Sequence, residues 1–131
     1  MSKEIKFKYI WSNPTKTNFL TEIFTLDQIE HGEQFMVLEN EPLLKNYRRV
    51  AILQWTGLKD KNGKEIYEGD VVFSESNQYY KQDEIVWDCF AMGWDIGKKD
   101  SWKLRSPMSS KTEIIGNIYE NPELITGVKN G

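Results

Sequence analysis

Turn-forming residues recur at short intervals between Gln54 and Phe73, in the middle of a sequence of 131 residues. The pair Asn62-Gly63 predicts a hairpin, because both residue types tolerate the positive φ that a two-residue turn of the favoured twist requires. Gly57 interrupts the same segment a few residues earlier. Turns at this spacing leave no room for a long helix, so the segment predicts a bent, barrel-like meander of short strands.

A second turn in this segment leads into an apolar strand. Gly69-Asp70 comes directly before Val71–Phe73, and the Asp70 carboxylate is suited to accept hydrogen bonds from nearby backbone amides. We therefore interpret these glycines, with Asn62 and Asp70, as structural turn residues. The charged residues around the turn are expected to be exposed and not to form a catalytic cluster. They are Lys59, Asp60, Lys61, Lys64 and Glu65.

Strands are also predicted outside the central segment. Ile5, Phe7 and Tyr9 alternate with charged residues, and this period of two is typical of an amphipathic strand. Gly116 interrupts an apolar run near the carboxyl end, where a bulge or a close-packed backbone is expected. Apolar runs bounded by turn residues predict further strands over 19–24, 34–38, 49–55, 84–87, 90–96 and 113–119.

Helical signals are few and short. Thr25 and Gln28 have the spacing of a capping box, which predicts one or two helical turns that end at Gly32. His31 falls at the end of this helix, where its charged form would meet the negative pole of the backbone dipole. The length favours one core, so we expect one domain over residues 1–125 and a flexible tail over 126–131. The predicted fold is mainly β (β-rich α+β): a small bent antiparallel sheet or barrel-like domain with one or two short helices.

Positive and negative charges are nearly balanced. The sequence has 17 Lys and Arg against 20 Asp and Glu, a formal net charge of −3. Without a basic excess, the attraction needed for non-specific phosphate binding is weak, so nucleic acid is a possible but not a favoured partner. Net charge does not describe how the charges are distributed, and a local basic patch stays open. Its candidate residues are Lys45, Arg48, Arg49, Lys98 and Lys99.

The sequence contains a single cysteine, Cys89. One cysteine excludes an internal disulfide and a thiolate-rich zinc site within one chain, and it fits the reducing conditions of a cytoplasm. Because Cys89 lies between Trp87 and Phe90 in an apolar setting, we expect its thiol to be buried and inert. No apolar stretch approaches membrane-spanning length, so no association with a membrane is expected.

Aromatic and thioether side chains are concentrated between residues 87 and 102, at Trp87, Phe90, Met92, Trp94 and Trp102. One interpretation is that they fill a core, since large rings dominate burial in small sheets. The alternative is an exposed platform that recognises a base, a carbohydrate or a peptide. The candidate contact surface consists of Trp87, Trp94 and Trp102 together with Tyr79 and Tyr80.

No familiar catalytic motif occurs in the sequence: a nucleophile elbow, a phosphate-binding loop, a dinucleotide fingerprint and a zinc-protease helix are all missing. Asp88, Asp95 and Asp100 lie near the aromatic cluster, but they lack the ordered spacing of a calcium loop. We therefore expect no catalytic residue, no cofactor and no metal. An enzyme of unfamiliar design stays open, and a deep cleft lined by Asp70, Asp88 or Asp95 with unusual proton affinity would favour it.

Three blocks of the sequence resemble the YopX proteins, which are found in bacteriophages and in prophage regions of Gram-positive bacteria. The middle block, Leu53–Val72, and the closing block, Ile114–Leu124, are similar to the hallmark segments of that family. The opening block, Lys3–Lys8, is similar to the family's charged amphipathic start. Tyr9–Trp11 departs from the Ala-Trp-Asp that usually follows it.

The resemblance implies a small, largely β protein of phage or prophage origin in a bacterial host cell. It implies no established reaction and no catalytic set, and it is compatible with self-association. Our first hypothesis is a non-enzymatic module that binds protein or takes part in an assembly. The alternative is a small barrel-like regulator associated with nucleic acid, with bases stacked on Tyr79, Tyr80, Trp94 or Trp102.

Overall fold

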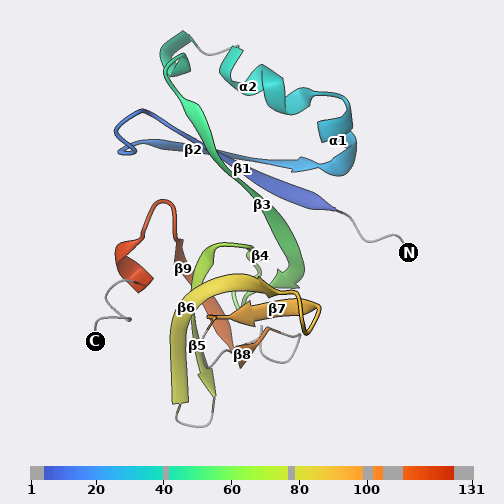
Figure 1. Ribbon diagram of the computed structural model, residues 1–131, viewed down its shortest axis with the longest axis vertical. Helices are drawn as coiled ribbons and strands as arrows, with labels where there is room; N and C mark the ends of the chain where they lie inside the picture. The colour runs from blue at the N-terminus through green and yellow to red at the C-terminus, as the bar shows by residue number, and fades with distance from the viewer. Residues whose placement is uncertain (1–4, 40–41, 77–78, 99–101, 105–110, 126–131) are drawn as a thin grey trace. The chain divides into compact units, whose positions relative to one another are not determined.

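The computed structural model describes residues 5–39, 42–76, 79–98, 102–104 and 111–125 (Figure 1). Within these ranges the chain is mainly β, as predicted, with two antiparallel sheets and two short α-helices. Neither sheet closes into a barrel among the described residues. The chain divides into two compact units, Met1–Trp55 and Thr56–Gly131.

The first unit is built on the strands β1 (Lys6–Ser12), β2 (Phe19–Thr25) and β3 (Arg48–Lys59). β1 lies between β2 and β3 and pairs antiparallel with both. The pairing of β1 with β3 shifts register between Ile10 and Trp11, which leaves one extra residue on β3. β3 continues past the end of this unit, and its neighbour there is β4 (Glu65–Tyr67).

The segment between β2 and β3 is helical. It contains α1 (Leu26–Glu30), η1 (Glu33–Phe35), α2 (Met36–Glu39) and η2 (Pro42–Leu44). The predicted capping box is confirmed: the Gln28 amide donates to Thr25 Oγ1 over 3.2 Å, and the Thr25 amide donates to Gln28 Oε1 over 2.8 Å. Gly32, with φ of 77°, follows the end of α1.

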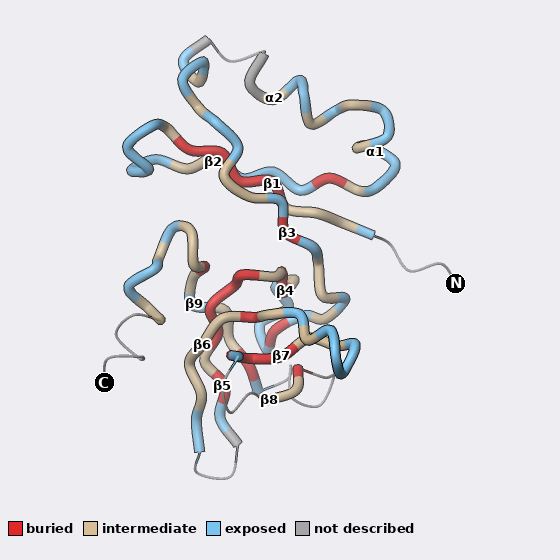
Figure 2. The backbone as a smooth tube through the Cα atoms, in the orientation of Figure 1, coloured by how far each residue is buried: buried red, intermediate tan, exposed pale blue. Residues whose placement is uncertain are grey.

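The strand predicted over residues 34–38 is wrong, because this run forms η1 and α2. A short apolar run does not distinguish a strand from one or two helical turns. Val37 of this segment packs on a buried cluster of Tyr9, Trp11 and Phe24, and Ile29 of α1 packs on the same cluster. Figure 2 shows the buried positions along β1, on the sheet that these helices cover.

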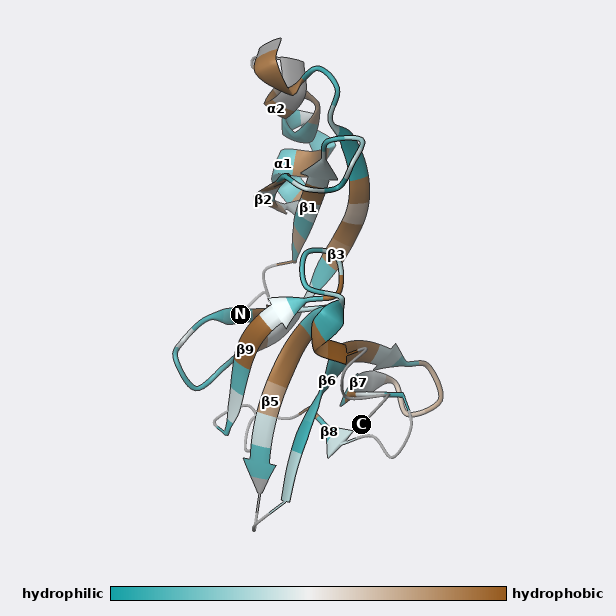
Figure 3. Ribbon diagram, turned by 90° about the vertical axis from the view of Figure 1, so that its left-hand side faces the viewer, coloured by the Kyte–Doolittle hydropathy of each residue, from teal (hydrophilic) through white to brown (hydrophobic). Residues whose placement is uncertain are grey.

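The second unit contains the strands β5 (Asp70–Ser76), β6 (Tyr79–Asp88), β7 (Gly93–Ile96), β8 (Trp102–Lys103) and β9 (Thr112–Asn117). They form a sheet in the order β8-β7-β6-β5-β9. Figure 3 shows hydrophobic residues in the first part of β5, where Val71, Val72 and Phe73 follow Asp70. The core of this unit consists of Ile66, Val72, Ile85, Ile96 and Leu104.

Among the described residues, each unit contains one of the two clusters described above. Four further apolar residues are buried and belong to neither cluster: Ile10, Leu53, Tyr67 and Val71. One domain over residues 1–125 stays a prediction. The predicted tail over 126–131 lies outside the described residues.

The turn at Asn62-Gly63 differs from the predicted two-residue turn. The Gly63 amide donates to the Asp60 carbonyl over 3.0 Å, and the Asp60 amide donates to the Lys64 carbonyl over 2.7 Å. Gly63 has φ of 84°, whereas Asn62 is not among the described non-glycine residues with positive φ. This is a type I turn followed by a left-handed glycine, the usual solution for a slightly longer hairpin loop.

Asp60 corrects another expectation, because it is buried, with 5% of its surface exposed. Its Oδ1 accepts hydrogen bonds from the amides of Asn62 and Lys64, each over 2.9 Å. Its Oδ2 accepts from the amide of Ile114 in β9 over 3.0 Å. One carboxylate therefore fixes the turn and joins it to a strand that lies far away in the sequence.

The other turn residues have similar local roles. Asp70 Oδ2 accepts a hydrogen bond from the Tyr67 amide over 2.8 Å, and Gly69 between them has φ of 84°. Gly57 also has positive φ, at 88°. At Gly116 the pairing of β5 with β9 shifts register, and a Cβ atom there would lie 2.6 Å from Asn121 Oδ1.

Candidate functional site

The five aromatic residues predicted as a contact surface lie in two different places. Tyr79 and Tyr80 begin β6, whereas Trp87 lies near its other end. At about 3.3 Å per residue, the two groups are roughly 25 Å apart along the strand. The pair Tyr79 and Tyr80 is exposed, at 73% and 70%, and Tyr80 stacks on Phe73 with ring centroids 5.6 Å apart.

The three tryptophans divide between core and surface. Trp94 and Trp102 are partly buried and pack against the core of the second unit. Trp87 is 45% exposed and meets Trp94 edge-on across β6 and β7, with ring centroids 5.0 Å apart. Trp94 and Trp102 therefore contribute to the core, whereas the recognition of a ligand by the exposed Trp87 stays a prediction.

Two highly exposed apolar side chains lie beyond the tryptophans, in the loop that joins β6 to β7. Asp88 and Gly93 form the last pair of the two strands, so the loop consists of residues 89–92. Phe90 is 96% exposed and Met92 is 73% exposed. Figure 2 shows this loop as exposed. We call Trp87, Cys89, Phe90 and Met92 the hairpin tip.

Cys89 is exposed, so the expectation of a buried thiol is wrong. Its apolar neighbours in the sequence are exposed as well, because residues in a short hairpin loop project away from the sheet whatever their polarity. The sequence offered a signal for this loop, since Asp88 and Gly93 are typical residues for the start and end of a turn. Without that signal, the apolar character of Phe90 and Met92 predicts burial.

Asp88 holds the backbone of the hairpin tip. Its Oδ1 accepts hydrogen bonds from the amides of Phe90, over 3.0 Å, and Ala91, over 3.3 Å. Its Oδ2 accepts from Lys103 Nζ over 3.1 Å. The hydrogen bond from Lys103, followed by those from the two amides, lowers the pKa of Asp88 below its usual 3.8.

Lys103 also binds a second carboxylate, that of Asp95, which is nearly buried. Lys103 Nζ lies 3.0 Å from Asp95 Oδ1 and 3.3 Å from its Oδ2. The hydrogen bonds to Asp95 and then to Asp88 raise the pKa of the Lys103 ammonium. Asp88 and Asp95 are therefore brought together by Lys103, whose ammonium group lies between the two carboxylates. Asp100 lies outside the described residues.

The lowered pKa of Asp88 favours a structural role for this carboxylate over a role in proton transfer. A carboxylate with a lowered pKa is a weak base near neutral pH, and general catalysis is most effective when the pKa of the group is near the working pH. Among the described residues, no group of three or more His, Cys, Asp and Glu could hold a metal ion.

His31, the sole histidine, is exposed at the end of α1, where its Nδ1 lies 2.7 Å from the Asp27 carbonyl oxygen. That carbonyl, followed by the Asp27 carboxylate, raises the pKa of the imidazole. The ring therefore lies at the helix end, as its position in the sequence predicted, and its charged form would meet the negative pole of the backbone dipole there. None of the described helices is long and apolar enough to cross a membrane.

Comparisons with known proteins place the chain in a family. No curated protein matches the sequence. The crystal structure of protein EF1440 from Enterococcus faecalis is 25% identical to it, over 89% of this chain and 74% of that one, with a TM-score of 0.46. The YopX protein family matches residues 6–126, nearly the whole length. The chain therefore belongs to the YopX protein family.

Proposed function

We propose that this protein is a non-enzymatic module that binds protein, either a second copy of itself or another component of an assembly, through the hairpin tip. The observation that carries the proposal is Phe90, a large ring that is 96% exposed on a loop of fixed conformation. Met92 in the same loop is 73% exposed, and Trp87 near the end of β6 is 45% exposed. Aromatic and methionine side chains of this kind are enriched at the centres of protein interfaces.

The energetics support a contact role. Burial of one exposed phenylalanine side chain contributes about 1.5 to 3 kcal/mol, which corresponds to roughly tenfold to hundredfold in affinity. The loop is already held by Asp88, through the Phe90 and Ala91 amides, so little additional ordering is needed when a partner binds. The tip can therefore bind as a preorganised apolar anchor.

The alternative of nucleic acid stacked on the predicted aromatic residues receives less support. Of those four residues, Trp94 and Trp102 are partly buried against the core. Tyr79 and Tyr80 remain as an exposed pair at the other end of β6. A stacking platform needs open ring faces, and one face of Tyr80 is already covered by Phe73.

The setting of this activity is part of the proposal. We infer a role in a bacteriophage or prophage, with the resemblance of the middle and closing sequence blocks as support. We also propose a cytoplasmic location in the bacterial host cell, and the single cysteine, Cys89, supports it because it is compatible with reducing conditions. Self-association through the hairpin tip would make the protein a homo-oligomer.

The test compares two apolar residues of nearly equal exposure. Phe90→Ser removes the anchor of the hairpin tip, and Leu43→Ser is the control, because Leu43 is 92% exposed in the other unit. Light scattering over a range of concentrations measures self-association. Immobilised wild-type and variant proteins are also compared for the proteins that they retain from host cells carrying the phage.

We expect Phe90→Ser to weaken self-association, or the retention of a partner, by at least about tenfold, in line with the burial of one aromatic ring. Leu43→Ser should behave like the wild type. The proposal is wrong if the wild-type protein is monomeric at every concentration and retains no protein. It is equally wrong if the two serine variants cannot be distinguished.

A further inference from the structure

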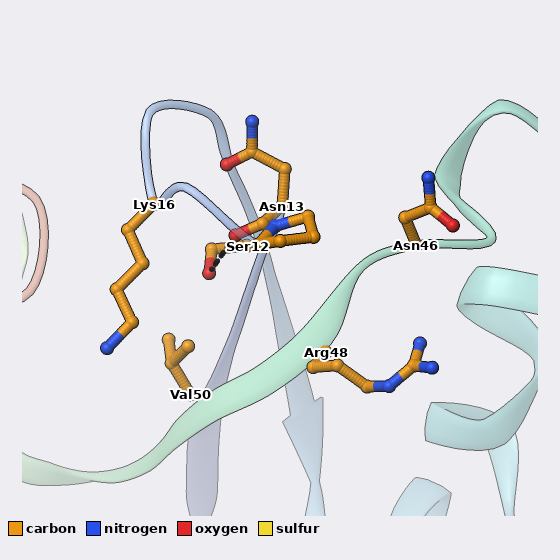
Figure 4. Close-up of a pocket in the computed structure, with 7 residues that line it drawn as sticks. Ser12, Asn13, Lys16, Asn46, Arg48 and Val50 are labelled. Atoms are coloured by element: carbon orange, nitrogen blue, oxygen red, sulfur yellow. Dashed lines mark hydrogen bonds between the residues drawn. The ribbon is translucent and has the colours of Figure 1, made fainter.

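A groove in the first unit is lined by cationic and amide side chains, unlike the apolar hairpin tip. It is a cavity of about 370 Å³ beside the loop that joins β1 to β2, and it is shown in Figure 4. Two cationic side chains and two amides line it, and none of its lining residues carries a carboxylate. The lining residues are Ser12, Asn13, Pro14, Lys16, Asn46, Arg48 and Val50.

The loop on one side of the groove is held by Asn13. Its Oδ1 accepts hydrogen bonds from the amides of Thr17, over 2.9 Å, and Asn18, over 3.0 Å. The Lys16 amide donates to the Asn13 carbonyl over 3.0 Å, and Lys16 has positive φ, at 58°. The backbone of Lys16 is therefore fixed, and its ammonium group extends from a defined position.

The other side of the groove is formed by the start of β3. Arg48 pairs with Ser12, whereas Arg49 pairs with Trp11, whose ring is buried in the core of this unit. Paired residues of neighbouring strands share a face, so Arg48 lies on the groove side and Arg49 on the opposite side. The register shift leaves Val50 as the extra residue of β3, and it lies in the groove between the two cationic side chains (Figure 4).

The donors around the groove are available. Arg48 uses Nη1 to donate to the carbonyls of Lys45, over 3.2 Å, and Tyr47, over 3.0 Å, and this anchors the guanidinium. Its remaining N–H groups, the Lys16 ammonium and the Asn46 amide have no hydrogen-bond or ion-pair partner among the described residues. The site thus presents several unused donors beside an apolar floor.

The surrounding sequence is also positively charged, although the chain as a whole is not. Residues 5–21 and 42–55 contain no Asp or Glu. They include β1, the loop after it, the first residues of β2, the η2 segment and the part of β3 that pairs with β1. The cationic residues in these stretches are Lys6, Lys8, Lys16, Lys45, Arg48 and Arg49.

We propose that this groove binds the backbone of a single-stranded nucleic acid. Lys16 and Arg48 lie on opposite sides of Val50 (Figure 4), which suits two successive phosphates better than one small anion. The apolar floor can accept a sugar or a base face, and the Asn46 amide offers both a donor and an acceptor to a base edge. The volume lies within the range of about 300 to 1,000 Å³ that is usual for ligand sites.

Fluorescence anisotropy with labelled 15-nucleotide oligo(dT) and oligo(U), at about 25 mM salt, tests the proposal because phosphate contacts are strongest at low ionic strength. The variants are Lys16→Gln and Arg48→Gln. Arg49→Gln is the matched control, since it removes the same charge from the next residue on the opposite face. Circular dichroism and urea unfolding confirm that each variant is folded.

We expect Lys16→Gln and Arg48→Gln each to weaken binding by at least about threefold and to lower the slope of log affinity against log salt by about 0.7. Arg49→Gln and Phe90→Ser should bind as the wild type does, which separates this site from the hairpin tip. The proposal is overturned if the wild type does not bind, or if Arg49→Gln weakens binding as much as Arg48→Gln. It is also overturned if oligoglutamate of the same length competes as well as oligo(dT), because an acidic peptide would then be the favoured ligand.

Discussion

At the hairpin tip, the conformation of an exposed loop depends on one carboxylate. Asp88 accepts two hydrogen bonds from backbone amides and one from Lys103. Only the ionised carboxylate offers both oxygens as acceptors to these donors without a competing proton. The order of Phe90 in its exposed position therefore follows the ionisation of Asp88.

The sign of the pH dependence follows from the direction of the shift. Because the pKa of Asp88 is lowered in the folded protein, its contribution to stability is present above its usual value of 3.8 and is lost as the pH falls through the lower folded value. We expect the Asp88 carboxyl signal to titrate by NMR below pH 3.8 in the wild type. In Lys103→Gln the midpoint should rise, because Lys103 is the largest cause of the shift. A wild-type midpoint at or above 3.8 would contradict this account.

The sequence showed which aromatic residues are concentrated near the hairpin tip, but not which of them are buried and which are exposed. The concentration of aromatic side chains near Trp87 was visible, and Trp94 and Trp102 do pack on the core. Phe90 and Met92 are exposed because they lie in a loop, and residue type predicts burial only on average. The hydrogen bonds from Phe90 and Ala91 to Asp88 depend on loop geometry that periodicity does not describe.

At the scale of elements, the hairpin after β3 is organised by Asp60. Replacement by alanine would leave the amides of Asn62, Lys64 and Ile114 without their acceptor. Because a buried donor without a partner costs about 1 to 3 kcal/mol, we expect Asp60→Ala to lower the free energy of unfolding by about 3 kcal/mol, with some amides reaching water. Urea unfolding measures this change.

The control for this prediction is Lys61→Ala. Lys61 adjoins Asp60, and its side chain makes an exposed ion pair with Glu113 over 3.7 Å. A surface pair of this kind contributes at most about 1 kcal/mol. If Asp60→Ala destabilises the protein no more than Lys61→Ala does, the three hydrogen bonds do not have the role assigned to them here.

Elements were predictable where one local interaction determines them. The capping box at Thr25 and Gln28 acts within four residues, and it forms as predicted. The turn at Asn62-Gly63 was located correctly, but its type depends on the buried Asp60 side chain and its partner in β9. The run 34–38 became helical because the segment packs Val37 on the core of the first unit. Contacts from distant parts of the chain decided both of these differences.

At the scale of the whole molecule, one strand belongs to both units. β3 pairs with β1 before the boundary at Trp55, and it has β4 as its neighbour beyond it. The two core clusters share no residue. Composition and length predict how much surface such a chain buries, but the division into two clusters depends on strand pairing. The strand order and the groove beside β3 could not be derived from the sequence for the same reason.

Because the two core clusters share no residue, we expect a cavity in one unit to lower the stability of that unit more than that of the other. Ile85 is fully buried in the second unit, and Ile85→Ala should lower its stability by about 2 to 5 kcal/mol. Hydrogen exchange followed by NMR should then show faster exchange of the amides in β5 and β6, while β1 keeps its protection. An equal increase in β1 would instead show that both units unfold together, and it would support the prediction of one domain over residues 1–125. The reciprocal variant Phe24→Ala, in the core of the first unit, should reverse the pattern.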